Sequence, residues 1–193
     1  LVVRMQGVLT KLQKELGITF VYVTHRQSEA FAMSDRVVIM NQGRIEQIDS
    51  AKGIYRNPAT RFVAEFVGAN NILTGTVIAT DGLIEIETPA GRFKCAENSD
   101  HIWSIGDTAS LVISADLIRL STSAVNDTNE MACRFISEEF VGSIVTVLAE
   151  TPDGADFRIQ LQQRELSELD LKVGATVYVR WDSHDVHLLR DTA

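Results

Sequence analysis

The most informative run of this 193-residue sequence is Ile18-Thr19-Phe20-Val21-Tyr22-Val23-Thr24-His25. Six apolar or β-branched residues follow one another and end in a threonine and a histidine, which is typical of a fully buried strand that finishes at a functional edge. Thr24 and Gln27 have the spacing of a capping box, so the sequence predicts a short helix from His25 to Met33. His25 would then lie at the carboxyl end of a strand and the amino end of a helix, a place that suits an anion such as phosphate.

The residues before this run predict an amphipathic helix. Its apolar residues fall on one helical face, and Gly17 is a natural C-cap. A helix that leads into a buried strand is half of an α/β unit. The apolar positions of this face are Leu1, Met5, Val8, Leu9, Leu12 and Leu16.

Between residues 34 and 68 the sequence predicts one hairpin and two short helices. In the hairpin turn Asn41-Gln42-Gly43-Arg44, the glycine supplies a positive φ. Each helix has a capping residue at its start and a proline or glycine at its end. The predicted elements are strands at 37–40 and 45–48, a helix capped by Asp49 or Ser50 and ended by Asn57-Pro58, and a helix that begins at Thr60 and stops at Gly68.

Charge divides the sequence into two parts. The chain holds 18 Lys and Arg and 26 Asp and Glu, for a net charge of −8. Residues 1–70 carry nine basic and six acidic residues, a net of +3, whereas residues 71–193 carry nine basic and 20 acidic residues, a net of −11. We therefore expect two domains, with the boundary near Gly68-Ala69-Asn70-Asn71.

Residues 71–193 contain many short β-rich runs, several of them alternating. Turn signals such as Asp81-Gly82 and Pro152-Asp153-Gly154 separate these runs. Strands of this length and spacing predict a small antiparallel barrel or sandwich, with a polar loop at 121–130. The runs lie at 76–78, 83–87, 92–95, 110–113, 144–148, 157–161, 177–181 and 186–189.

Composition fits a protein that is not inserted in a membrane. The apolar content of 45% is ordinary. No apolar run approaches the roughly 20 residues that span a bilayer, and no basic-then-apolar leader begins the sequence. Cys95 and Cys133 form neither a CxxC nor a metal-ligand spacing, so we expect reduced, partly buried thiols of a cytosolic protein.

Four motifs stand out in residues 1–73: Gly17-Ile18-Thr19-Phe20-Val21-Tyr22-Val23-Thr24-His25, Met33-Ser34-Asp35-Arg36-Val37, Met40-Asn41-Gln42-Gly43-Arg44-Ile45-Glu46-Gln47 and Ile54-Tyr55-Arg56-Asn57-Pro58. Their order and spacing resemble the end of the ATPase domain of ABC transporters. The closest resemblance is to the ATP-binding subunits of bacterial importers for polyamines, ferric iron or sugars, with polyamine as the first expectation.

The resemblance gives His25 a role. It implies that His25 is the switch histidine, which contacts the γ-phosphate of ATP and helps to hold the attacking water. By spacing alone, a histidine after a strand is more often a solvent-touching loop residue than a catalytic one, so the role rests on the resemblance. Arg26 departs from the family, which usually has an acid at this position, and a guanidinium beside the imidazole would favour an anion.

The motifs that bind nucleotide do not occur in this sequence. An ATPase of this class needs a GxxxxGK[ST] loop for the phosphates and an acidic pair for Mg²⁺ and water. Neither is present, and no LSGGQ-like stretch is present either. The resemblance places all three upstream of Leu1. We therefore expect ATP and Mg²⁺ to be cofactors of a longer protein and the chain itself to be inactive.

Motifs of the second half point to a regulatory barrel. They are Phe140-Val141-Gly142-Ser143, Leu171-Lys172-Val173-Gly174, Trp181-Asp182 and Val186-His187-Leu188-Leu189. They are similar to the transport-associated OB (TOBE) module that is appended to these importer ATPases. The expected fold is thus an α/β fragment, the end of an ABC ATPase domain, at residues 1–70, followed by an all-β OB-like barrel at 71–193.

Other functions of an OB-like barrel stay open. A free-standing barrel could bind a small ligand, an oxyanion or nucleic acid, but nucleic-acid barrels use a basic groove and exposed aromatic residues. The net charge of −11 disfavours nucleic acid, and Trp103 and Trp181 are better placed in the core. A metal site at His184 and His187 is also disfavoured, because residues three apart on a strand face opposite sides.

The resemblance also implies partners. In the intact subunit, ATP would close two nucleotide domains and thereby drive the membrane permease subunits, from a peripheral position on the cytoplasmic face of the inner membrane. The β-domains of this family commonly pair, so we expect a homodimer through residues 71–193. An unpaired apolar strand at 18–23 is the other surface through which two chains could associate.

Overall fold

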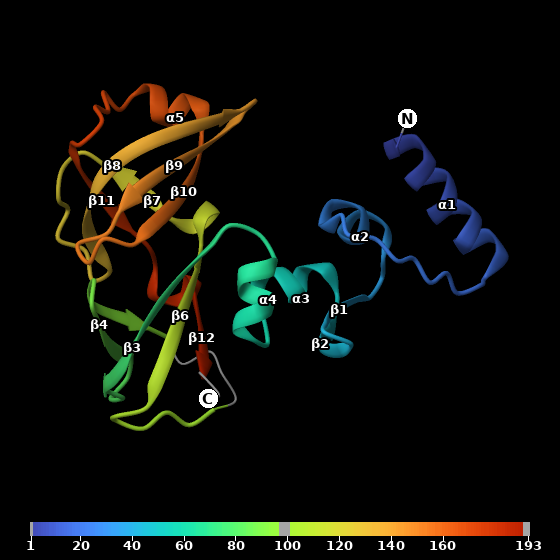
Figure 1. Ribbon diagram of the computed structural model, residues 1–193, viewed down its shortest axis with the longest axis horizontal. Helices are drawn as coiled ribbons and strands as arrows, with labels where there is room; N and C mark the ends of the chain where they lie inside the picture. The colour runs from blue at the N-terminus through green and yellow to red at the C-terminus, as the bar shows by residue number, and fades with distance from the viewer. Residues whose placement is uncertain (1, 97–100, 191–193) are drawn as a thin grey trace. The chain divides into compact units, whose positions relative to one another are not determined.

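The computed structural model describes residues 2–96 and 101–190, and of residues 2–4 the backbone only. The chain divides into two compact units, Leu1–Val67 and Gly68–Ala193 (Figure 1). The first unit contains four helices and one hairpin among its described residues, and the second is mostly β. Each unit has its own hydrophobic core.

The first unit is built around the hairpin and the two short helices that follow it. Five buried residues form its core: Val37, Ile39, Ile54, Val63 and Val67. Its elements are α1 (Val2–Leu16), α2 (Gln27–Met33), β1 (Val37–Asn41), β2 (Arg44–Asp49), α3 (Ala51–Arg56) and α4 (Arg61–Phe66).

Local sequence signals for the hairpin and for α3 and α4 are confirmed. Gln42 and Gly43 both have positive φ, 47° and 78°, which gives the hairpin the turn twist that suits two antiparallel strands. The Ser50 hydroxyl accepts a hydrogen bond from the amide of Gly53, and the Thr60 hydroxyl accepts one from the amide of Val63. These two caps fix where α3 and α4 begin.

The predicted buried strand at 18–23 is wrong for this structure. These residues form no strand, and Val21 and Val23 are 89% and 90% exposed. A strand of a parallel sheet needs hydrogen bonds from neighbouring strands, and none of the strands in the described part of the chain pairs with this run. The apolar face of α1 is likewise exposed, with Met5, Val8 and Leu16 all more than half accessible.

The predicted capping box is also wrong. Helix α2 begins at Gln27 instead of His25, and its N-cap is Arg26, which makes no side-chain capping bond. The hydroxyl of Thr24 is used elsewhere, because it binds Glu29 and accepts a hydrogen bond from the amide of Arg26. His25 therefore lies before the helix, and the predicted position at a helix amino end is not formed.

The second unit consists of two five-stranded antiparallel sheets around one core. One sheet has the order β12-β6-β3-β4-β5 and the other the order β10-β9-β8-β11-β7. All eight predicted β-rich runs are confirmed as strands, and two strands were not predicted, β7 and the long β8. The strands are β3 (Asn70–Ala79), β4 (Ile84–Thr88), β5 (Gly91–Cys95), β6 (Thr108–Ser114), β7 (Arg119–Ser121), β8 (Glu130–Val141), β9 (Ile144–Glu150), β10 (Asp156–Gln162), β11 (Thr176–Arg180) and β12 (Val186–Arg190).

The two sheets are built by the same plan, which makes the unit an internal repeat. In each half of the unit, three consecutive strands form a meander and the fourth strand pairs with the first strand of that meander. A short 3-10 helix follows, η1 (Ala115–Leu117) or η2 (Ser183–Asp185), and the fifth strand then crosses to the other sheet. Thus β7 pairs with β11, and β12 pairs with β6.

Two buried asparagines join the sheets at equivalent places in the repeat. The side chain of Asn71 on β3 donates to the carbonyl of Arg158 and accepts from its amide, at 2.8 and 2.7 Å. Asn129, immediately before β8, makes the same pair of bonds with Lys94 on β5, both at 2.7 Å. In each case the start of one half's first strand is bound to the third strand of the other half.

The core of the second unit is apolar and contains both tryptophans. Trp103 and Trp181 are 5% and 4% exposed, so the expectation that they fill the core is confirmed. The ring of Trp181 lies 4.9 Å from that of Phe93 on β5 and 5.9 Å from that of Phe157 on β10. One side chain thus packs against a strand from each sheet.

We predict that the asparagine bridges stabilise the second unit. Asn129→Ala leaves the amide and carbonyl of Lys94 without partners, so it should lower the free energy of unfolding by about 2–4 kcal/mol. Urea unfolding followed by tryptophan fluorescence measures this, because both tryptophans lie in the second unit. The neighbouring Thr128→Ala is the control and should change the value by less than about 0.5 kcal/mol. Equal midpoints for the two variants would contradict the role of the bridge.

The cysteines give a second test of this core. Cys95 and Cys133 are free and buried, and burial raises the pKa of both thiols to about 12. We predict negligible reaction with a thiol reagent at pH 8 in the native chain, since the reactive thiolate is almost absent and enclosed. In concentrated guanidinium chloride both thiols should react. Labelling of two thiols per native chain would show that the core opens readily.

Candidate functional site

The residue singled out by the sequence, His25, lies at a bend between an extended run and α2. Its side chain is exposed. The residues around it are held by Glu29, which lies in the first turn of α2 and is 9% exposed. The sequence analysis did not identify Glu29. The signal that could have identified it is its position four residues after the histidine, in the first turn of the predicted helix.

Three donors near His25 bind the carboxylate of Glu29. The hydroxyls of Tyr22 and Thr24 donate to Oε2, at 3.0 and 2.9 Å. The guanidinium of Arg26 pairs with Oε1 at 2.9 Å. Residues on both sides of the histidine are thus tied to a single side chain.

These bonds shift the ionisation of the two acidic partners in opposite directions. The hydrogen bonds from Thr24 and then Tyr22 lower the pKa of Glu29, with a further contribution from the charge of Arg26. The same bond to Glu29 raises the pKa of Tyr22. At neutral pH the site therefore holds an ionised carboxylate and a neutral phenol.

Arg26 does not act as a free cation beside the imidazole. The sequence suggested that its guanidinium would favour an anion next to His25, but the guanidinium is paired with Glu29. Part of its charge is neutralised in this pair. The guanidinium of Arg26 is therefore held by the carboxylate three residues further along the chain.

The chemistry available to this segment is limited. His25 can offer one imidazole to a ligand, and α2 has only seven residues. The sequence supplies no phosphate-binding loop and no acidic pair for Mg²⁺.

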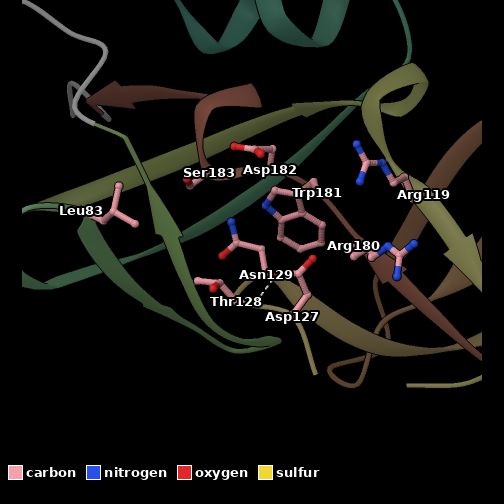
Figure 2. A pocket seen from close by; sticks show the side chains of 9 residues that line it. All are labelled: Leu83, Arg119, Asp127, Thr128, Asn129, Arg180, Trp181, Asp182 and Ser183. Carbon is pink, nitrogen blue, oxygen red and sulfur yellow. Dashed lines mark hydrogen bonds between the residues drawn. The ribbon is translucent and has the colours of Figure 1, made fainter. Parts of the chain in front are cut away.

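A polar pocket of about 160 Å³ lies in the second unit, at the end of β11 (Figure 2). Arg119 and Arg180 line it and lie directly opposite each other on β7 and β11. Asp182 also lines it, and the hydrogen bonds from His184, first that of its backbone amide, lower the pKa of this carboxyl. None of these residues was a predicted site residue, because the pairing of β7 with β11 joins segments about 60 residues apart in the chain.

Two buried donors at this pocket have no hydrogen-bond partner among the described residues: Nε of Arg180 and Nε1 of Trp181. They belong to consecutive residues of an extended chain and so face opposite sides. Figure 2 shows the indole nitrogen of Trp181 turned away from the guanidinium groups of Arg119 and Arg180. The two donors therefore do not converge on a single small ligand.

Two features are absent from residues 2–96 and 101–190. Within these ranges, no three His, Cys, Asp or Glu side chains are grouped as metal ligands. Within the same ranges, no helix combines the length and the apolar character needed to cross a membrane.

Comparison with known proteins identifies relatives along almost the whole chain. Residues 111–189 match the TOBE domain family. The spermidine/putrescine import ATP-binding protein PotA of Rubrobacter xylanophilus is 34% identical over 188 residues, which are 96% of this chain and 49% of the relative. The PotA proteins of Thermobifida fusca and Pseudomonas aeruginosa are each 37% identical, again over 96% of this chain and over 48% and 52% of the relatives. The chain thus spans about half the length of these relatives.

A solved structure has a fold similar to that of part of this chain. The cytoplasmic molybdate-binding protein ModG has a TM-score of 0.56 and 18% identity, and the match covers 63% of this chain and 96% of ModG. At this identity the likeness concerns the fold alone, and it supports an OB-like β-domain. The chain is therefore similar, over almost its entire length, to about half of the spermidine/putrescine import ATP-binding proteins, and its residues 111–189 match the TOBE domain family.

Proposed function

We propose that this chain is the C-terminal part of the ATP-binding subunit of an ABC importer for polyamines. The observation that carries the proposal is the similarity to spermidine/putrescine import ATP-binding proteins along 96% of the chain. In this proposal residues 1–70 are a portion of the nucleotide-binding domain, and residues 71–193 are the regulatory β-domain. The intact subunit couples ATP hydrolysis to uptake of the solute.

His25 is the switch histidine of the proposed ATPase. Its exposed side chain is available to a phosphate presented by the rest of a nucleotide-binding domain. An imidazole near the γ-phosphate can hold the attacking water in line with the phosphorus, and positioning of this kind carries much of the catalysis in phosphoryl transfer. ATP and Mg²⁺ are bound by the longer protein, because the phosphate loop and the acidic pair are not in residues 1–193.

The proposed partners follow from the same assignment. The intact subunit binds the membrane permease subunits and lies on the cytoplasmic face of the inner membrane. Two copies associate through residues 71–193, so that the β-domains pair while the nucleotide domains open and close. The net charge of −11 of this region continues to disfavour a nucleic-acid partner.

ATP hydrolysis gives the first test of this proposal. We predict that the 193-residue chain neither binds ATP tightly nor hydrolyses it, whereas the chain extended upstream to the length of its relatives is an active ATPase. His25→Ala in the extended protein should lower kcat by about 100-fold or more, because the attacking water loses its positioning group. Nucleotide binding and ATPase rate are measured side by side for the three proteins.

Two results would contradict the proposed ATPase role. An extended protein without ATPase activity, or one in which His25→Ala leaves kcat unchanged, would remove the mechanism from this assignment. His101→Ala, which changes a histidine of the other structural unit, is the matched control and should leave kcat unaltered.

Association of the β-domains gives a separate test. We expect both the 193-residue chain and the isolated residues 70–193 to be dimers by light scattering. A monomeric 70–193 together with a dimeric full chain would place the contact in residues 1–69 instead. The exposed apolar run at 18–23 would then be the surface responsible.

A further inference from the structure

We propose that Glu29 is the residue that positions His25. This inference rests on the proposed function, in which His25 acts on the γ-phosphate. Glu29 does not meet the phosphate itself in this proposal. It holds the chain on both sides of the histidine and thereby sets where the imidazole lies.

The geometry places all the bonds of Glu29 around one residue. Its two oxygens bind side chains that lie three and one residues before His25 and one residue after it, at 2.9 to 3.0 Å. The hydroxyl of Thr24 also accepts a hydrogen bond from the amide of Arg26, at 3.0 Å. The backbone is thus closed into a small loop across the histidine, and the loop is bound to the first turn of α2.

Helix α2 is itself tied to the remainder of the first unit. The amide of Glu29 donates to the carbonyl of Arg26 at 3.1 Å, which begins the helix next to the loop. The side-chain amide of Gln27 donates to the carbonyl of Phe66 at the end of α4. Helix α2 is therefore fixed to the rest of the first unit, and Glu29 links this helix to the segment that carries His25.

A carboxylate in this position is costly unless it is fully paired. Burial of a charge is unfavourable without hydrogen bonds and an opposite charge, and Glu29 is 9% exposed. An apolar side chain would anchor α2 without that cost. Three donors bind its two oxygens and offset the cost of burying the charge. Because these donors flank His25 in the sequence, we assign to the carboxylate the role of holding this segment.

The same arrangement accounts for Arg26. In this chain an arginine pairs with Glu29 at 2.9 Å, so the pairing adds a third restraint on the segment. Arg26 therefore acts on His25 through Glu29, as part of the same loop.

The kinetic test uses the extended protein. Glu29→Leu removes every acceptor, and we expect kcat to fall by about tenfold or more while the KM for ATP changes by less than about twofold, because the imidazole is displaced and the nucleotide contacts are not. Glu29→Gln should recover part of kcat, since its carbonyl oxygen still accepts from the hydroxyls. Glu65→Gln breaks an exposed ion pair with Arg61 on α4 and should change neither constant.

Two conservative variants distinguish a loss of positioning from a loss of folding. Tyr22→Phe and Thr24→Val each remove one hydroxyl and little volume. Each should lower kcat by a smaller factor and should have no further effect in the Glu29→Leu background, because the acceptor is already gone. An unchanged kcat in Glu29→Leu would overturn the proposal. So would a double variant whose loss of kcat equals the product of the losses in Glu29→Leu and in the hydroxyl variant alone.

A local measurement separates this inference from the proposed function. In the 193-residue chain, Glu29→Leu should speed exchange of the hydrogen-bonded amides of Arg26, position 29 and Ala30, and Glu65→Gln should not. Unchanged exchange at these amides would overturn the positioning role whatever the ATPase result. Failure of His25→Ala to lower ATPase activity would instead overturn the role of the histidine and leave the exchange result to decide whether Glu29 holds the segment.

Discussion

The second unit depends on an exchange of one strand between its two halves. Each half builds a four-stranded sheet from its own residues and sends its fifth strand, β7 or β12, to the edge of the other sheet. Neither five-stranded sheet is complete without the other half. The asparagine bridges of Asn71 and Asn129 repeat this reciprocity, because each binds the first strand of one half to the third strand of the other. Folding of the two halves is therefore coupled by backbone pairing as well as by the shared core.

The same requirement for backbone pairing explains the difference between the two units. Antiparallel strands of the second unit find their partners within the unit, and its alternating residues are buried on one side. The run at 18–23 has the composition of a central strand, but no described strand pairs with it, and its side chains are exposed. Composition expresses a preference for a strand, and hydrogen bonds from neighbours decide whether one forms.

Local signals predicted the parts of the fold that local interactions determine. The turn at Gln42 and Gly43, the caps at Ser50 and Thr60 and eight strands of the second unit were legible in the sequence. The short β7 gave no signal of its own, since three residues cannot show a period. The asparagine bridges and the internal repeat were missed because they join residues 35 and 87 apart in the chain. Register at that distance follows from the packing of whole sheets.

The candidate site shows the same division between local pattern and spatial arrangement. His25 was found because motifs around it resemble a family in which a histidine acts at this point, whereas the capping box assigned to Thr24 was wrong. The hydroxyl of Thr24 donates to the carboxylate of Glu29 and accepts a hydrogen bond from the amide of Arg26, so it does not cap a helix through the amide of Gln27. Once Glu29 takes the hydroxyls of Thr24 and Tyr22, the helix starts two residues later and His25 is left outside it. The side chains on both sides of His25 thus bind one buried carboxylate, and this contact in space could not be inferred from the local pattern.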